Sequence, residues 1–119
     1  MGKLKAEGDN KNIYTLVEGD DEEYRNMVKT SDKLIIVDFF AEWCGPCKMI
    51  GPKFKDMASD FPNCIFVKVD VDEFEDIAEE QGINCMPTFV FFRKGEKIEV
   101  FSGANDKKLK EKIKELASK

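Results

Sequence analysis

Two cysteines three positions apart, Cys44 and Cys47, are the residues of this chain best suited to chemistry. They follow an apolar run, residues 34–40, which predicts a buried strand, and they precede a segment that predicts a helix. The first turn of a helix has unpaired backbone N–H groups that favour negative charge, including a thiolate. We therefore predict a redox-active pair. Cys44, expected to be the more exposed sulfur, would attack a disulfide, and the more buried Cys47 would resolve the mixed disulfide.

Zinc sites use the same cysteine spacing, but a structural zinc ion usually needs four ligands. The other two cysteines, Cys64 and Cys85, are single, and the chain has no histidine. Gly45-Pro46 between the thiols favours the redox interpretation, because proline presets a backbone angle suited to the start of a helix. We predict no metal site, and we keep a zinc module and a redox-inert interaction module as the two competing hypotheses.

A single carboxylate, Asp38, interrupts the apolar run. Burial would raise the pKa of its carboxyl group, which could then exchange a proton with a nearby thiol near neutral pH. Lys68, in the neighbouring predicted strand, would temper that shift. The alternatives are that Asp38 faces solvent at a strand end or forms an inert ion pair with Lys68, and the sequence favours neither side.

The segment around Pro87 also combines unusual residues. Proline cannot donate a hydrogen bond to a sheet, so Pro87 marks the start of a strand or a turn, and Met86-Pro87 is a candidate for a cis peptide bond. Cys85 is either a small apolar filler or, if exposed, a third thiol able to form intermolecular disulfides.

The remaining pattern predicts an α/β fold with a central mixed sheet and helices on both faces. Residues 1–11 are predicted to be a flexible N-terminal extension, and residues 12–119 a single domain. The predicted strands are 13–17, 34–40, 64–70, 88–92 and 97–101, the last two joined in a hairpin by residues 94–96. The first predicted helix is capped by Asp20 or Asp21 and ends near Lys29. Two more helices are predicted at residues 45–59 and 74–80. The last predicted helix has Leu109, Ile113 and Leu116 on one face.

Composition excludes several classes of function. The net charge of −5 and the interleaving of basic with acidic residues argue against nucleic-acid binding. No apolar segment approaches the roughly 18 residues that a membrane span requires. No signal-peptide pattern is present and the cysteines are few, so we expect a cytoplasmic protein. There is no G-x-G-x-x-G motif for a bound nucleotide cofactor.

Residues 39–48, Phe-Phe-Ala-Glu-Trp-Cys-Gly-Pro-Cys-Lys, resemble the active-site signature of the thioredoxin family. Four more family motifs follow in order: Pro52, which kinks a helix in the family; Lys68, which is a buried lysine there; Met86-Pro87-Thr88; and residues 101–105. The resemblance spans residues 12–118, and the sequence around Cys85 is similar to that of eukaryotic cytosolic members.

This resemblance implies a thioredoxin fold and a protein-disulfide reductase, an oxidoreductase whose redox-active disulfide bond serves electron transport and cell redox homeostasis. It implies that Cys44 is the nucleophile, that Cys47 is the resolving thiol, and that Asp38, modulated by Lys68, assists proton removal from Cys47. The residues implied to accept an extended substrate chain are Trp43, Gly45, Pro46, Met86, Pro87 and Gly103.

The resemblance also implies partners. Disulfide-containing proteins would be the substrates. A separate thioredoxin reductase would supply electrons from NADPH, so that no cofactor is bound by this chain. The protein would be a monomer, with Cys85 available to link a homodimer, as the matching cysteine does in some relatives.

Overall fold

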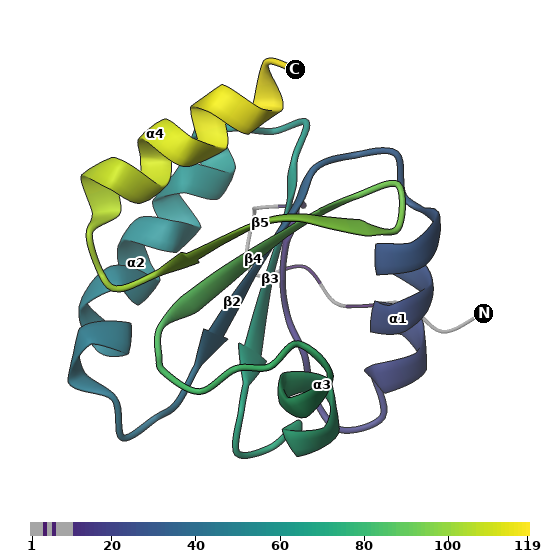
Figure 1. The fold of residues 1–119 in the computed structure, drawn as a ribbon, viewed down its shortest axis with the longest axis vertical. Coiled ribbons are helices and arrows are strands. Elements are labelled where there is room, and N and C mark those ends of the chain that lie inside the picture. The colour runs from purple at the N-terminus through teal and green to yellow at the C-terminus, as the bar shows by residue number, and fades with distance from the viewer. Residues whose placement is uncertain (1–3, 5, 7–10) are drawn as a thin grey trace.

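The computed structural model, which describes Leu4, Ala6 and residues 11–119, has a five-stranded mixed sheet and four helices in that part of the chain (Figure 1). In chain order the elements are β1 (Ile13–Thr15), α1 (Asp21–Thr30), β2 (Ile35–Phe40), α2 (Gly45–Asp60), β3 (Ile65–Asp70), α3 (Glu75–Glu80), β4 (Thr88–Arg93), β5 (Glu96–Ser102) and α4 (Asp106–Ala117). The strand order is β1-β3-β2-β4-β5. Strands β1 and β2 run parallel to β3, whereas β4 is antiparallel to β2 and to β5. The predicted fold class is confirmed.

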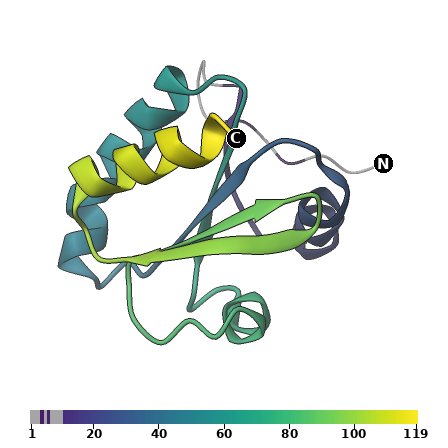
Figure 2. The ribbon, with the colours of Figure 1, turned by 45° about the horizontal axis from the view of Figure 1, so that its top comes forward.

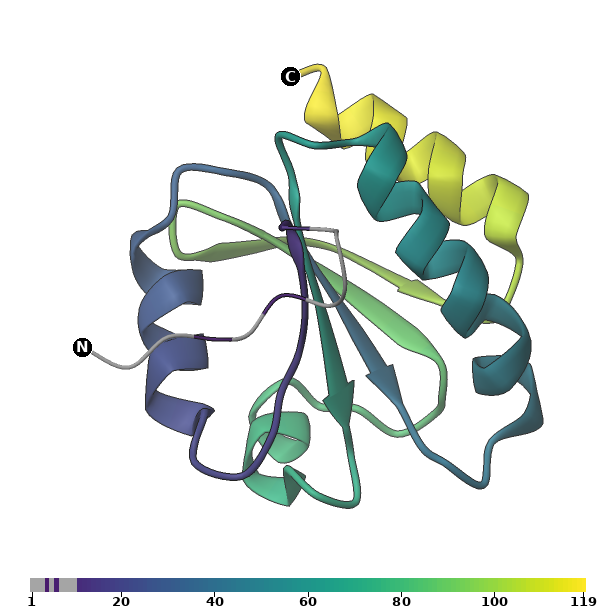
Figure 3. The same ribbon diagram turned by 180° about the vertical axis from the view of Figure 1, so that it is seen from behind.

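Helices cover both faces of the sheet, α2 and α4 on one side and α1 and α3 on the other (Figure 2). Seen from behind, α2 and α4 lie side by side (Figure 3), and their apolar faces form one core cluster that includes Phe54 and Leu109. A second cluster packs Tyr24 of α1 and Ile77 of α3 against the opposite face. The sheet therefore separates two apolar cores.

Strand β2 lies in the middle of this arrangement, which explains its continuous apolar sequence. Its residues Ile35 to Phe39 are all buried, because β3 and β4 flank the strand and helices cover both faces. Side chains alternate between faces, so Asp38 points to the same face as Ile36, the face that α2 covers. Only residues 41–44 separate the end of β2 from the start of α2.

The β4–β5 hairpin is tighter than predicted, because Glu96 belongs to β5 and not to the turn. Lys94 and Gly95 form a two-residue turn in which both residues have positive φ, 54° and 82°. Turns of this kind match the twist of the flanking strands. Gly95 fits because glycine adopts such angles without steric cost.

The structure also refines the N-terminal part of the prediction. Strand β1 ends at Thr15, two residues earlier than predicted. Asp20 occupies the N-cap position of α1, but its carboxylate accepts a hydrogen bond from the Val17 amide instead of capping the helix. The predicted flexible extension, residues 1–11, falls largely outside the described residues and stays a prediction. Of its described members, Leu4 packs against the core cluster of α1 and α3, and Ala6 forms an antiparallel bridge with Tyr14.

Within the part of the chain that the structure describes, no helix is long and apolar enough to cross a membrane.

Candidate active site

The two cysteines of the predicted redox pair form a disulfide at the start of α2. Cys44 is the N-cap residue of this helix, with extended backbone angles, and its Cα lies 5.3 Å from that of Cys47. The Cys47 backbone N–H donates a hydrogen bond to Cys44 Sγ over 3.2 Å. An N-cap side chain normally accepts such a bond through oxygen; here sulfur takes that place, where a thiolate would be stabilised.

The expected difference in exposure between the two cysteines is not seen in the disulfide form. Cys44 was expected to be more exposed than Cys47, but their exposed fractions are 6% and 5%. The disulfide holds Cys44 Sγ against the helix start, and Ala41 and Met86 pack beside it. Cys44 Sγ also lies 3.7 Å from the carbonyl oxygen of Met86. The exposed fractions of the two residues therefore do not distinguish them, whereas the hydrogen bond from the Cys47 amide to Cys44 Sγ does.

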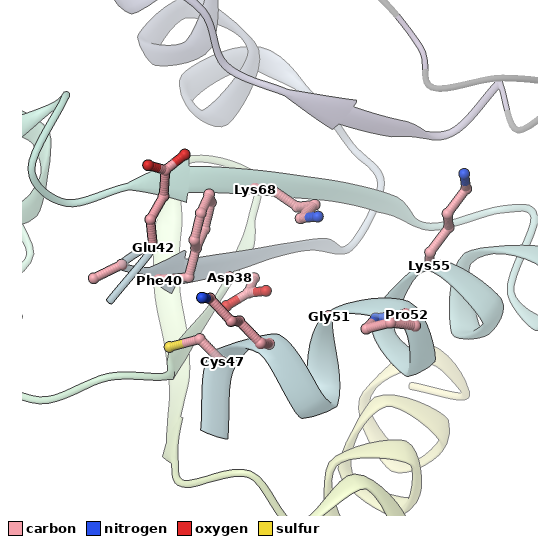
Figure 4. Close-up of a pocket in the computed structure, with 10 residues that line it drawn as sticks. Asp38, Phe40, Glu42, Cys47, Gly51, Pro52, Lys55 and Lys68 are labelled. Atoms are coloured by element: carbon pink, nitrogen blue, oxygen red, sulfur yellow. The ribbon is translucent and has the colours of Figure 1, made fainter. Parts of the chain in front are cut away.

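Asp38 lies behind the disulfide, where only 1% of it is exposed. It shares the wall of a cavity of about 750 Å³ with Cys47 and Lys68, and Figure 4 shows all three side chains around it. Burial raises the pKa of the Asp38 carboxyl group from 3.8 to about 7, and the positive charge of Lys68 partly offsets this rise. Of the alternatives left open by the sequence, a solvent-facing Asp38 is wrong.

Lys68 is the register partner of Asp38 across β2 and β3. Although the family resemblance led us to expect a buried lysine, Lys68 is only half-buried. Its ammonium nitrogen lies 5.6 Å from the centroid of the Phe40 ring, a distance at which the ring face attracts a cation. Among the described residues Lys68 forms no ion pair with Asp38, so the inert-pair alternative is also wrong.

The loop before β4 lies next to the disulfide, and the Met86–Pro87 peptide bond is cis. Gly103 follows β5 and donates a backbone hydrogen bond to the Pro87 carbonyl over 2.9 Å. Gly103 has a φ of 103°, an angle that side-chain-bearing residues rarely adopt. This bond holds the end of β5 against the cis-proline loop, so two of the predicted substrate-accepting segments meet.

The predicted substrate-accepting residues differ in how much surface they offer. Trp43 has an exposed fraction of 69%, and Gly45, Pro46 and Gly103 are also exposed. Met86 is half-buried and Pro87 is buried.

Two neighbours of this surface were not predicted from the sequence. Asp72, in the turn after β3, accepts a 2.8 Å hydrogen bond from Trp43 Nε1 and so fixes the exposed indole. Met49 on α2 has an exposed fraction of 74%. Nothing in the spacing links Asp72 to Trp43, 29 residues away. The helical phase of Met49, two residues after buried Cys47, could have indicated exposure.

The other two cysteines lie in different surroundings. Cys64 is buried and precedes β3, at the end of the sheet opposite the disulfide. Cys85 is exposed, which favours the interpretation as an accessible third thiol. Its Sγ lies 3.5 Å from Thr88 Oγ1 and 3.7 Å from Ser102 Oγ, and these hydroxyl groups lower the pKa of the thiol.

Within the described residues, no group of three or more histidine, cysteine, aspartate or glutamate side chains is placed to hold a metal ion.

Comparison with known proteins identifies relatives of this chain. The family model described as Thioredoxin matches residues 15–115. Thioredoxins of Oryctolagus cuniculus and Homo sapiens are 56% and 55% identical to this chain over 85 residues, which cover 71% of this chain and 81% of each relative. The crystal structure of thioredoxin NaTrxh from Nicotiana alata has 36% identity and a TM-score of 0.82, and covers 93% of this chain and 97% of its own. That of Fasciola hepatica thioredoxin has 46% identity and a TM-score of 0.74, with 85% and 93% covered.

The family model covers strand β2, the disulfide and the cis-proline loop, because all three lie between residues 15 and 115. The Cys44–Cys47 pair at the start of a helix is thus found in the sequence context where related chains carry out thiol–disulfide exchange. The chain belongs to the thioredoxin family of protein-disulfide oxidoreductases.

Proposed function

We propose that this chain reduces disulfides of other proteins in two steps, with Cys44 as the nucleophile and Cys47 as the resolving thiol. In the first step the Cys44 thiolate attacks one sulfur of the substrate disulfide. That S–S bond breaks, a mixed disulfide forms, and the released substrate thiolate takes up a proton. In the second step the Cys47 thiolate attacks Cys44 Sγ, the mixed disulfide breaks, and the Cys44–Cys47 disulfide forms. The second substrate sulfur leaves as a thiolate and takes up a proton. Two electrons pass from the dithiol to the substrate.

The assignment of Cys44 as the nucleophile rests on the hydrogen bond from the Cys47 N–H to Cys44 Sγ at the start of α2. The Cys47 N–H points at Cys44 Sγ, and N–H groups at a helix start favour negative charge, so Cys44 is the sulfur more easily held as a thiolate. No equivalent donor to Cys47 Sγ is found among the described residues. Cys44 also lies beside the cis-proline loop, where a substrate chain would arrive.

Asp38 is the proposed proton acceptor for Cys47. Both side chains line the same cavity, and the pKa of Asp38, raised to about 7 by burial, suits proton exchange at neutral pH. Lys68 modulates this exchange, because its charge favours the ionised carboxylate. A carboxyl group in solution, with a pKa near 4, would be a weaker base for the same proton.

The substrate chain is proposed to lie across Trp43, Gly45, Pro46, Met86, Pro87 and Gly103. Substrates are disulfide-containing proteins, and a separate thioredoxin reductase returns electrons from NADPH. The protein works in the cytoplasm as a monomer, within electron transport and cell redox homeostasis, and Cys85 can link two copies. Membership of the thioredoxin family supports these assignments.

Reduction of insulin, coupled to NADPH oxidation through a thioredoxin reductase, tests the proposal. Wild type should turn over continuously, and Cys44→Ser should be inactive because the attacking thiol is missing. Cys47→Ser should accumulate a covalent complex with substrate, visible on a non-reducing gel, because nothing resolves it. Cys64→Ser is the matched control and should behave like wild type, since Cys64 is buried at the far end of the sheet. Trapped complexes in Cys44→Ser, and none in Cys47→Ser, would reverse the roles.

A further inference from the structure

The cavity beside the disulfide extends well beyond the group that the proposed reaction uses. Its volume of about 750 Å³ falls in the range of small-molecule sites, and it lies between the ends of β2 and β3 and one side of α2. The ring of Phe40 and the side of Pro52 give it apolar walls (Figure 4). Proton transfer between Asp38 and Cys47 needs no space of this size. The cavity can therefore hold a ligand of its own.

The charged groups around the cavity are mostly positive. Lys48 and Lys55 of α2 and Lys68 of β3 line it, and Glu42 is the one carboxylate beside Asp38. None of these three lysines forms an ion pair within the described part of the chain. Lys53, also on α2, is by contrast paired with Asp106 over 3.5 Å. Ammonium groups that form no ion pair, gathered around one cavity, favour a negatively charged occupant.

Asp38 adds a second, independent indication of a ligand. Its Oδ1 atom is buried in the wall of the cavity and has no hydrogen-bond partner among the described residues. Buried polar atoms are nearly always hydrogen-bonded in proteins, so this atom calls for a partner. A protonated Asp38 carboxyl group could donate a hydrogen bond to an anionic oxygen, in the way that paired carboxylic acids share a proton.

We propose that this cavity binds a small organic anion, a carboxylate on an apolar body about the size of a benzene ring. The charges of Lys55 and Lys68 attract the carboxylate, which accepts a hydrogen bond from Asp38. The apolar body packs against Phe40 and Pro52. The site is distinct from the substrate-accepting surface around Trp43 and Gly103, and it forms in the oxidised protein, in which Cys44 and Cys47 are joined. It does not rest on the reductase activity.

A titration of the oxidised protein with benzoate, followed by the backbone amide NMR signals, tests the proposal. Saturable shifts should be concentrated at Phe40, Gly51 and Lys68. Benzamide, which has the same shape without the charge, and inorganic phosphate, which has charge without an apolar body, should each bind at least about threefold more weakly. Shifts that do not saturate, or that spread over the lysines of α4, would overturn the proposal.

Two lysines on one helix provide matched variants. Lys55→Gln should weaken benzoate binding by about threefold or more, because it removes one ammonium group from the cavity. Lys53→Gln removes the same charge from α2 but outside the cavity, and it should leave the benzoate affinity unchanged. Equal effects of the two substitutions would show a general response to protein charge and would overturn the proposal.

The pH dependence of binding separates Asp38 from the surrounding groups. The charged groups that face it are Lys68 of β3, Lys48 and Lys55 of α2, and Glu42; Cys47 is held in the disulfide. The window from about pH 6 to about pH 8 brackets the titration of the Asp38 carboxyl group, whose pKa burial raises to about 7. Benzoate affinity should fall several-fold across this window, because an ionised Asp38 repels an anion. Asp38→Asn should bind with little pH dependence; a fall equal to that of wild type would contradict the proposal.

Discussion

At the scale of single residues, the site depends on a carboxyl group and a sulfur placed where their ordinary chemistry changes. Asp38 is buried in the middle of a sheet, and the loss of hydration favours its neutral form. Cys44 has the opposite environment, because a helix start and its free N–H groups favour a negative charge. One fold thus raises the pKa of an acid beside Cys47 and supplies a position for a thiolate at Cys44.

Asp38→Asn should change how stability depends on pH. In wild type the unfolded chain releases the Asp38 proton above about pH 4, whereas the folded protein keeps it until about pH 7. The contribution of Asp38 to the unfolding free energy is therefore complete below pH 4. It falls by roughly 4 kcal/mol between these values and is constant above pH 7. The variant should lack this fall and should be the more stable protein at pH 8, as measured by denaturant unfolding at several pH values.

Asp56→Asn is the control for this series, because it removes an exposed carboxylate from α2 and should keep the wild-type slope. The reductase assay gives a second readout: Asp38→Asn should turn over more slowly at neutral pH, since the proposed proton acceptor is gone. If the unfolding free energies of wild type and Asp38→Asn changed equally with pH, the folded and unfolded states would bind the Asp38 proton equally.

The sequence predicted which residues are unusual more reliably than how they are surrounded. Asp38 stood out because it interrupts an apolar run, and the cysteine pair because of its spacing. The equal burial of Cys44 and Cys47 was not predictable, because it depends on packing by Met86 from a loop 42 residues away. The Trp43–Asp72 hydrogen bond was missed for the same reason. Contacts between distant segments leave no local pattern in a sequence.

At the scale of elements, the backbone conformation matters most at two positions, the start of α2 and the turn between β4 and β5. The bounds of β3, β4 and β5 were predicted to within one residue, because apolar runs and Gly95 mark them. The two-residue turn itself could not be separated from a three-residue loop, since Glu96 suits either. Gly95 also lies against the end of α1, where an added Cβ would be 3.0 Å from the Lys29 carbonyl oxygen.

Gly95→Ala should destabilise the protein by about 1–2 kcal/mol, because alanine is strained at positive φ and its Cβ would press on the end of α1. Gly51→Ala is the matched substitution inside α2. Its Cβ would have no neighbour within 4 Å, and alanine is the better helix former, so it should stabilise by up to about 1 kcal/mol. Denaturant unfolding of both variants checks this contrast. A Gly95→Ala protein as stable as wild type would mean that the turn relaxes without cost.

At the scale of the whole molecule, the chain carries its reactive groups at different places on its surface. The disulfide lies at the end of β2, whereas Cys85 is exposed in the loop before β4, where Thr88 and Ser102 lower the pKa of its thiol. Cys64 is enclosed at the opposite end of the sheet, where burial raises the pKa of its thiol. The fold thus leaves one free thiol able to meet a second copy of the chain. The layered arrangement was predictable from the order of the elements, but the exposure of these two cysteines was not.

Oxidation with diamide should convert wild type into a species of twice the monomer mass, because two exposed Cys85 thiols lose two electrons to the oxidant and form an intermolecular disulfide. Non-reducing electrophoresis and analytical ultracentrifugation measure this. Cys85→Ser should stay monomeric, whereas Cys64→Ser should dimerise like wild type. A dimer that persists in Cys85→Ser would assign the link to another cysteine.

The two outer strands of the sheet have a consequence for how the protein meets other chains. A free sheet edge can pair with any such chain and grow into an aggregate. At one edge β5 carries Glu96, Lys97 and Glu99, whose charges interrupt the exposed Ile98 and Val100. At the other edge β1 is only three residues long, and Ala6 bridges its Tyr14. Both edges thus discourage the pairing of this sheet with a strand of another chain.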